Sequence, residues 1–285
     1  MKRFLFLVVL LVFGGCSLKN DIKKEELKSS EKEEISVNFE IYNANLGSKI
    51  SYESLINELK NSDIVLLGEV HNDKSHHFFQ NMVINSLNDD ISVVFEMIDI
   101  DKQGVVSLAK QNKKSISKSE LPKSLEWQKG WDYELYKEIV ESVFYSDKKM
   151  IAGNLTKNEI KNIYKEMPSL KGELSTSNFV KDSLKSVIKD AHKEFMSNLS
   201  DEFLDKMVLV QIHKDRRMAE RLLEQPNLAI LLAGRFHTDK TLGVPTHIKD
   251  ATKNKRVVVV GLGYEDENLT SSSRNSADFL VIFKH

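Results

Sequence analysis

The chain has 285 residues, of which 41% are hydrophobic and 29% are charged, so it can bury the core of one large or two small domains. Its formal net charge of −1 gives no reason to expect nucleic acid as a partner. The single cysteine, Cys16, excludes an intramolecular disulfide.

The N-terminal residues have the pattern of a bacterial export signal. Lys2 and Arg3 precede an uninterrupted apolar run, 4–13, which is too short to span a bilayer as a helix. Small residues stand just before Cys16, as in a lipobox. We therefore expect a lipoprotein signal peptide at residues 1–15 and acylation of Cys16, with an ordinary secreted protein as the alternative.

The residues after the cysteine suggest where such a lipoprotein resides. Ser17 occupies the position at which Asp commonly retains lipoproteins at the inner membrane, which favours the outer membrane of a Gram-negative bacterium. The segment 16–38 is rich in Lys, Glu and Ser, and it cannot bury enough apolar surface to order itself. We expect a flexible tether there, followed by an α/β domain over residues 39–285.

Two apolar runs that each end in Gly-x-x-His organise this domain. Ile64–Leu67 leads into Gly68 and His71, and Leu228–Ala233 leads into Gly234 and His237. Continuous apolar runs of this length are typical of strands buried on both faces of a parallel sheet. We expect Gly68 to provide a sharp turn through its freedom of backbone dihedrals.

Other runs of the chain alternate between strand and helix patterns. The fold class expected from this alternation is α/β, with a mostly parallel β-sheet flanked by helices. The polar, helix-rich stretch at about 157–205 is expected to be a helical insertion that forms a smaller all-helical subdomain. Further strands are expected at 39–42, 92–96, 149–153, 256–261 and 279–283, and helices at 52–60, 74–87, 103–110, within 127–144, and at 201–224.

Polar side chains gather where the predicted strands end. Because parallel strands share one carboxyl edge, these side chains are expected to lie together; they are Glu69, His71, Glu96, Asn154 and His237. Two outcomes stay open. Either His71, Glu69 and His237 bind a divalent metal, or the group forms a hydrogen-bonded network that fixes the loops.

Predicted helices add further polar residues to this group. Gln80 lies on the inner stripe of the helix at 74–87. Gln211 and Asp215 lie on the apolar face of the longest helix, a placement that is costly unless both are hydrogen-bonded. The pair His76-His77 is expected to be a partly exposed helix start.

Six groups of residues follow one another in a consistent order along the chain. They are Leu67–His71 with Gln80, Phe95-Glu96-Met97 with Gln103, Trp131 to Tyr136, Ala152–Leu155, Gln211 through Asp215 to Ala219, and Gly234–His237 with Gly243-Val244-Pro245. Together these groups resemble the ChaN family, the iron-regulated, haem-binding lipoproteins of Gram-negative bacteria within the haem-binding-uptake and Tiki group. The resemblance runs from about Phe39 to Ile248, and the lipobox fits the same family. The second Gly-x-x-His departs from the family through Arg235-Phe236.

The resemblance implies haem as cofactor, a role in iron acquisition or storage, and a homodimer that encloses haem between its protomers. An outer-membrane haem receptor is a further expected partner. Ferric haem suits a tyrosinate ligand, and Tyr136 and Tyr133 are favoured, followed by Tyr164. His192 resembles a family histidine and is expected to ligate iron or to hydrogen-bond the ligand.

Two other functions remain open from the sequence. A metal-dependent hydrolase would use Glu69, His71 and His237, although the sequence contains no HExxH or activated-nucleophile signature. A partner-binding lipoprotein without a small ligand is the other alternative, but it would not need polar residues gathered at strand ends.

Overall fold

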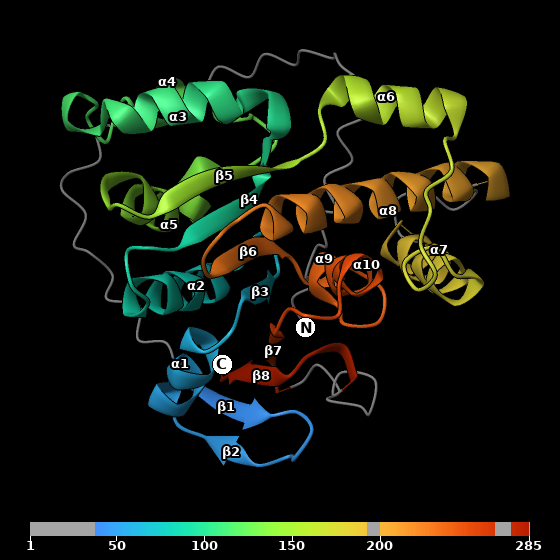
Figure 1. The fold of residues 1–285 in the computed structure, drawn as a ribbon, viewed down its shortest axis with the longest axis horizontal. Coiled ribbons are helices and arrows are strands. Elements are labelled where there is room, and N and C mark those ends of the chain that lie inside the picture. Colours follow the sequence, from blue (N-terminus) through green and yellow to red (C-terminus); the bar gives the residue numbers. More distant parts are fainter. Residues whose placement is uncertain (1–37, 193–199, 266–274, 285) are drawn as a thin grey trace, which may run out of the picture.

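The computed structural model describes residues 38–192, 200–265 and 275–284 (Figure 1). The expected signal peptide, Cys16 and nearly all of the expected tether lie outside the described residues. None of the described helices combines the length and apolar character needed to cross a membrane.

The strands are β1 (Phe39–Asn43), β2 (Lys49–Ile50), β3 (Ile64–Glu69), β4 (Ser92–Asp99), β5 (Lys149–Asn154), β6 (Ala229–Gly234), β7 (Val257–Tyr264) and β8 (Phe279–Phe283). The α-helices are α1 (Tyr52–Lys60), α2 (Lys74–Ser86), α3 (Gln103–Gln111), α4 (Leu121–Ser124), α5 (Tyr133–Tyr145), α6 (Lys157–Glu166), α7 (Asn178–His192), α8 (Asp201–Leu223), α9 (Arg235–Thr238) and α10 (Val244–Ala251). Short 3-10 turns cover Ile100–Lys102 and Lys113–Ser115.

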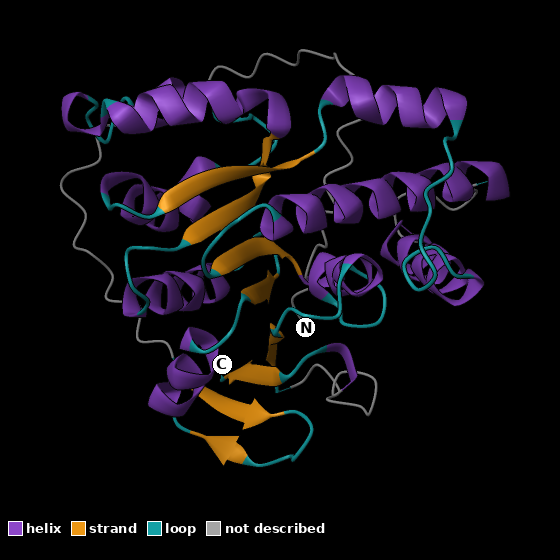
Figure 2. Cartoon of the chain, viewed as in Figure 1, coloured by secondary structure: helices purple, strands orange, loops and turns teal. Residues whose placement is uncertain are grey.

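The strands form one eight-stranded sheet in the order β2-β1-β8-β7-β3-β6-β4-β5. From β8 to β5 every neighbouring pair is parallel, whereas β1 runs antiparallel to both β2 and β8. Helices cover both faces of this sheet, as Figure 2 shows. The α/β class with a mostly parallel sheet is therefore confirmed.

Alternate residues of the central strands face two separate cores. Val65 and Leu67 of β3 pack on one face, against α1, α2 and α5. Ile64 and Leu66 pack on the other face, against α10 and the C-terminal half of α8. Since side chains alternate across a strand, burial on both faces requires the continuous apolar run seen in the sequence.

The two Gly-x-x-His strands, β3 and β6, are neighbours in the centre of the sheet, with Glu69 opposite Gly234. The chain leaves β3 toward α2 on one face, and it leaves β6 toward α9 and α10 on the other. Their carboxyl ends therefore form a topological switch point, which is where open α/β sheets bind ligands.

The segment 157–205 is helical, comprising α6, α7 and the start of α8. The helix α7 packs on the N-terminal half of α8 through a small apolar cluster of its own, Val180, Leu184, Val208 and Ile212. A second small cluster joins α6 to α8 through Ile163 and Val210. Whether this helical region is a separate subdomain stays a prediction.

Three local expectations are corrected. The strand expected at 39–42 is β1, for which the sequence suggested a place at the edge of the sheet, but it lies inside, because the two-residue strand β2 pairs beyond it. The Lys- and Ser-rich stretch 111–123, which by its composition was expected to be irregular, is so only in part, because it includes the 3-10 turn Lys113–Ser115 and the start of α4. Gly68 lies within β3 and has no positive φ, so its role is not conformational freedom.

Candidate functional site at the strand edge

Because the glycines of the two Gly-x-x-His motifs have no side chain, the two motifs can pack directly against each other. A Cβ on Gly68 would lie 2.2 Å from the Thr238 Oγ1 atom of α9, and a Cβ on Gly234 would lie 2.8 Å from the His71 Cε1 atom. The first motif's histidine ring therefore rests on the second motif's glycine. This mutual packing brings the two strand ends together.

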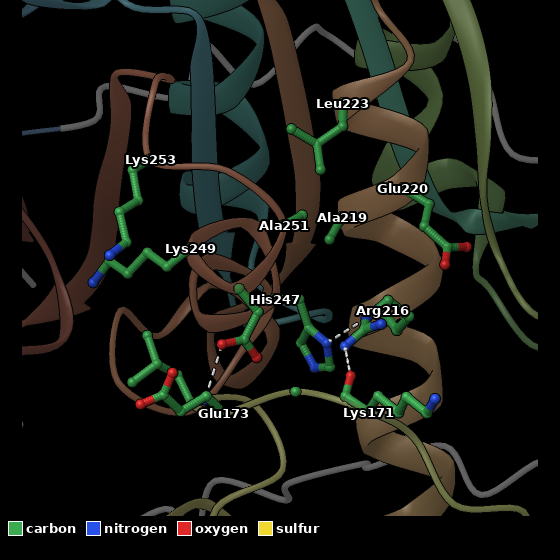
Figure 3. Close-up of a pocket in the computed structure, with 13 residues that line it drawn as sticks. Lys171, Glu173, Arg216, Ala219, Glu220, Leu223, His247, Lys249, Ala251 and Lys253 are labelled. Carbon is green, nitrogen blue, oxygen red and sulfur yellow. Dashed lines mark hydrogen bonds between the residues drawn. The ribbon is translucent and has the colours of Figure 1, made fainter.

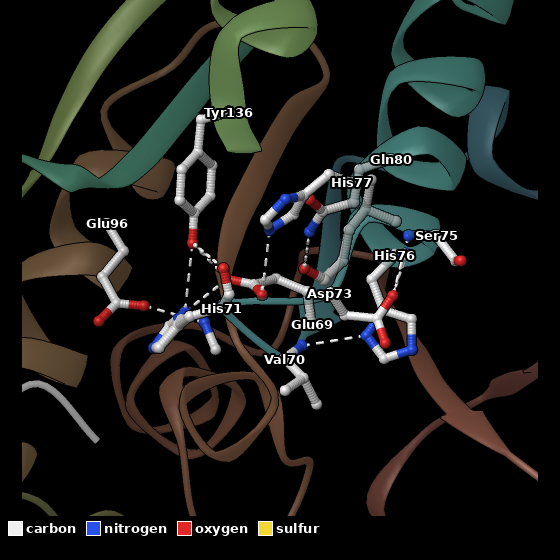
Figure 4. A network of polar contacts seen from close by, with 12 residues as sticks. Glu69, Val70, His71, Asp73, Ser75, His76, His77, Gln80, Glu96 and Tyr136 are labelled. Carbon is white, nitrogen blue, oxygen red and sulfur yellow. Dashed lines mark hydrogen bonds and ion pairs between the residues drawn. The ribbon is translucent and has the colours of Figure 1, made fainter. Parts of the chain in front are cut away.

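One half of the site is built around the carboxylate of Glu69, which is 2% exposed. His71 Nδ1 lies 2.6 Å from Glu69 Oε1, and His77 Nε2 lies 3.3 Å from Oε2. The Tyr136 hydroxyl donates a hydrogen bond of 3.2 Å to Oε1 (Figure 4). Burial alone would raise the pKa of Glu69, but His71 and His77 outweigh it and lower the pKa to about 2.

The other half is built around the imidazole of His237, which is buried between two carboxylates. Its Nε2 atom lies 3.1 Å from Glu96 Oε1, and its Nδ1 atom is bonded to Asp215 Oδ1. The Gln211 side-chain amide lies 2.9 Å from Nδ1. Burial opposes the charged ring, yet Glu96 and Asp215 together raise the pKa of His237 to about 10. His237 is therefore an imidazolium at neutral pH.

Backbone contacts hold these groups at the sheet edge. The Gly234 N–H donates to Glu96 Oε2 at 2.9 Å, and Asn154 Nδ2 donates to the Glu96 carbonyl at 2.8 Å. Gln80 Nε2 donates to the Leu67 carbonyl at 3.0 Å, beneath the site. The expectation that Asp215 needs a hydrogen bond is met by His237.

The pair His76-His77 is buried, which corrects the expectation of a partly exposed helix start. Asp73 caps α2, and the first turn of this helix thereby lies directly against the strand edge. His76 Nδ1 accepts a hydrogen bond from the Val70 N–H, and His77 reaches Glu69. This burial could have been predicted from the sequence, because a helix that starts so soon after the end of a strand must begin at that edge of the sheet.

His71 is the member of this cluster that meets solvent, with 29% of its side chain exposed. Trp131 contacts its ring edge to face, with the ring centroids 4.8 Å apart. A carboxylate that orients one ring nitrogen of a partly exposed histidine is an arrangement suited to proton transfer. The site can therefore hold and move protons.

The described residues contain no group of three or more His, Cys, Asp or Glu side chains arranged to hold a metal ion. The ring nitrogens of His237 are both occupied by carboxylates, and Glu69 is shared among His71, His77 and Tyr136. The divalent metal expected as a second cofactor thus finds no support at this edge. The hydrogen-bonded network is the outcome seen.

The remaining candidate residues lie away from the strand edge. Tyr133, at the start of α5, packs on Trp127 with a ring-centroid separation of 5.6 Å. Tyr164 lies on α6 and packs on Phe203 of α8. His192, at the end of α7, is buried; its Nδ1 lies 2.7 Å from the Ile188 carbonyl, and its Nε2 has no partner among the described residues.

The ion pairs of the strand edge predict a loss of stability at alkaline pH. A group whose pKa is raised in the folded state stabilises fully below its unfolded pKa, which for His237 is 6.5, and this contribution is lost as the pH rises through the folded value of about 10. We expect the free energy of unfolding, measured by urea denaturation, to fall over this range by at most about 1.4 kcal/mol for each step of one in pH. Unchanged stability between pH 7 and pH 10 would contradict this role of His237.

At acid pH, Glu69 affects the free energy of unfolding in the opposite direction: its contribution is lost as the pH falls. The pKa of Glu69 is lowered from 4.5 to about 2, so its contribution is present above pH 4.5 and is lost as the pH falls toward 2. Burial raises the pKa of Asp215 to about 6, which acts in the opposite direction. The lowered pKa values of Glu69 and Glu96 together outweigh it, so stability should also fall below pH 4.5.

Comparison with known proteins places this chain in a family. A family profile described as "Haem-binding uptake, Tiki superfamily, ChaN" matches residues 55–248. A solved structure described as cofacial haem binding to ChaN of Campylobacter jejuni is 36% identical to this chain. The alignment covers 88% of this chain and 98% of that one, with a TM-score of 0.81.

A protein from Bacillus cereus is far less similar, with 13% identity, a TM-score of 0.43, and coverage of 74% of this chain and 68% of that one. A comparison with curated proteins finds no match. The profile match, which includes both Gly-x-x-His motifs, and the similarity to the Campylobacter protein along most of both chains lead to one conclusion: this chain belongs to the ChaN family of the haem-binding uptake, Tiki superfamily.

Proposed function

We propose that this protein binds haem and serves haem or iron acquisition or storage. The observation that carries the proposal is the 36% identity, over 88% of this chain, to a Campylobacter jejuni protein whose structure is described as cofacial haem binding. The metal-dependent hydrolase and the partner-binding lipoprotein without a small ligand remain predictions from the sequence.

Within this proposal, we assign Tyr164 as the iron ligand, because it is the most suitable of the tyrosines in the described residues. A phenolic oxygen can bind iron only if it is reachable and free of other partners. Five of the seven tyrosines commit their hydroxyls to protein groups; they are Tyr42, Tyr52, Tyr136, Tyr145 and Tyr264. The Tyr133 hydroxyl has no partner, but it is buried.

Tyr164 differs from all of these. Its side chain is partly exposed, and its hydroxyl makes no hydrogen bond to any described residue. Its ring packs against a small apolar cluster of Leu155, Ile163 and Val210, against which Ile160 and Leu209 also pack. An apolar surface with one anionic oxygen ligand is what a ferric porphyrin requires. Tyr136 and Tyr133 are less suitable, because Tyr136 is buried in the core and the Tyr133 hydroxyl is buried although its side chain is partly exposed.

His192 is the second residue that we assign to haem. Its Nδ1 faces the Ile188 carbonyl and so carries the proton, which leaves Nε2 with a lone pair that no described residue uses. This nitrogen can bind iron or accept a hydrogen bond from a group on the iron. Because His192 is buried in the single chain, haem binding would have to expose it.

We further propose a homodimer. Haems that lie face to face need two protein surfaces, one on each outer face. The helical region offers exposed apolar side chains that suit such a contact: Met167 is 41% exposed, Leu174 46% and Phe179 65%. A dimer that buries these side chains would also shield the haems from water.

The cellular setting of the proposal comes from the sequence. Acylated Cys16 would anchor the protein to the outer membrane, and an outer-membrane haem receptor would be its partner. Two or more acyl chains on one cysteine hold a protein stably, since each buried methylene contributes about 0.8 kcal/mol.

The test is a titration of the full-length protein with haemin, followed by absorption spectroscopy and by measurement of molecular mass. We expect a shifted Soret band that saturates, together with a mass that doubles as haem is added. A spectrum equal to that of haemin in buffer would overturn haem binding. A saturating spectrum with an unchanged mass would overturn only the dimer.

A further inference from the structure

A cavity on the far side of α8 has no role in the haem proposal. It measures about 570 Å³ and lies between the C-terminal half of α8, the helix α10 and the loop at 171–174 (Figure 3). Two consecutive residues of α8 belong to different sites. Asp215 bonds to His237 at the strand edge, whereas Arg216 lines the cavity. Its volume is in the usual range for small-molecule sites.

Four cationic side chains line this cavity, and none of them lies within ion-pair distance of a carboxylate of the described residues. They are Lys171, Arg216, Lys249 and Lys253. Two other cations of α8 are paired, Arg217 with Glu159 and Arg221 with Glu224. A group of unpaired cations around one hollow is a favourable place for an anion.

Three acidic residues, Glu173, Glu220 and Asp250, also line the cavity, so its lining has one more cation than anions. Asp250 is occupied by the loop, because it accepts hydrogen bonds from the Leu174 N–H, from the Ser175 N–H and from the Ser175 hydroxyl. Glu220 also lines the cavity, and its carboxylate lies 3.6 Å from Arg217, a residue that does not line it. The carboxylate of Asp250 therefore holds the loop in place over the cavity.

Arg216 is held in one orientation. Its Nε donates to His247 Nδ1 at 2.9 Å, and its Nη2 donates to the Lys171 carbonyl at 2.7 Å. Its Nη1 makes no hydrogen bond to a described residue, so two N–H groups remain for a ligand. A fixed guanidinium with free donors is well suited to oxyanions.

His247 supplies a second and independent observation. It is 1% exposed, and burial, with Arg216 beside it, lowers its pKa to about 3. Because Nδ1 accepts from Arg216, the proton of the neutral ring is on Nε2. This buried Nε2–H has no acceptor among the described residues, although His247 lines the cavity. An oxygen of a bound anion would satisfy it.

We propose that this cavity binds a phosphate group carried on an apolar body. Phosphate has the charge and the several acceptor oxygens that Arg216, His247, Lys249 and Lys253 can share. The remaining walls include Ala219, Leu223 and Ala251, which suit an apolar attachment. A soluble phosphate ester and the headgroup of an anionic phospholipid share this chemistry.

The test compares the full-length protein with the double variant Lys249→Gln/Lys253→Gln. Both lysines are exposed and make no ion pair with described residues, so this variant should fold with an unchanged melting temperature. The matched control is Lys60→Gln/Lys74→Gln, which removes the same charge from exposed positions on α1 and α2. Inorganic phosphate and phenyl phosphate are titrated by calorimetry, and binding to vesicles of phosphatidylglycerol is compared with binding to phosphatidylcholine.

Binding of phenyl phosphate that weakens about tenfold or more in Lys249→Gln/Lys253→Gln, and not in the control, would support a soluble ester. A preference for phosphatidylglycerol that the same variant loses would instead identify the lipid headgroup. The parent protein and both variants carry the same acyl anchor, so its contribution to vesicle binding is equal in all three. No phosphate binding and no lipid preference, or equal values in all forms, would overturn the proposal. Haemin titration should be unchanged in the variant, which separates this site from haem.

Discussion

Tyr164→Phe is expected to weaken haem binding by roughly tenfold or more and to remove the spectral bands of an iron-bound tyrosinate, since even indirect support of a metal is often worth that factor. The substitution deletes one hydroxyl that has no partner among the described residues, so stability should hardly change. The measurements are haemin titration by absorption and the urea midpoint of the variant.

The other candidate tyrosines provide matched controls. Tyr133→Phe also removes a hydroxyl without a partner among the described residues, but from a buried position. Tyr136→Phe removes a hydrogen bond to Glu69 inside the core. Both are expected to leave the haem spectrum unchanged. Loss of the spectrum in Tyr136→Phe, with full binding in Tyr164→Phe, would assign the iron to the strand edge instead.

Haem affinity should also rise with pH. Burial raises the pKa of Tyr164, so the free side chain is a neutral phenol at pH 7. Binding to iron as a tyrosinate requires loss of this proton, and removing a proton is easier at higher pH. This dependence should disappear in Tyr164→Phe.

His237→Ala is expected to destabilise the protein by about 3 to 5 kcal/mol at pH 7, because removing one partner of a buried ion pair leaves uncompensated charge. Two buried carboxylates, Glu96 and Asp215, would lose their common counter-ion. Urea denaturation of the variant and the parent protein measures the difference. The loss should be smaller at pH 5, where the carboxylates can take up protons.

Two comparisons isolate the ion pair from the loss of a side chain. His213→Ala removes a histidine of α8 whose ring lies against the Pro168 carbonyl, and it should cost less than about 1 kcal/mol. In an Asp215→Asn background, the cost of His237→Ala should fall, since one of the two charges is already absent. Equal costs in both backgrounds would show that His237 acts through packing alone.

Particular residues show which features of the fold could be predicted from the sequence. The bounds of α1 were predicted to the residue, because its apolar spacing is regular and the Ser51 side chain caps it. Only two residues form β2, too few for any pattern to emerge. Gly68 and Gly234 were recognised as motif residues, but Gly68 was wrongly expected to provide a sharp turn. What they permit is contact with Thr238 and His71, from segments far away in the chain.

The burial of His76 and His77 shows the same limit. Their surroundings come from Tyr136, Tyr264 and Phe283, which lie on α5, β7 and β8. No local pattern around residue 76 encodes those elements. The unpaired cations of the α8–α10 cavity were also invisible, because Lys171, Arg216 and Lys253 are separate in sequence.

The sequence by itself determined the α/β class, the two central strands and the family, because apolar period and short motifs are local properties of the chain. It also predicted that five polar residues lie at one edge of the sheet, since parallel strands have their carboxyl ends at the same edge. These residues are Glu69, His71, Glu96, Asn154 and His237. Only the tertiary structure decided how these residues are used: as two buried ion-pair clusters rather than a metal site among the residues described. Pairing, burial and the freedom of a hydroxyl such as that of Tyr164 depend on which distant segments meet, and that is set by packing.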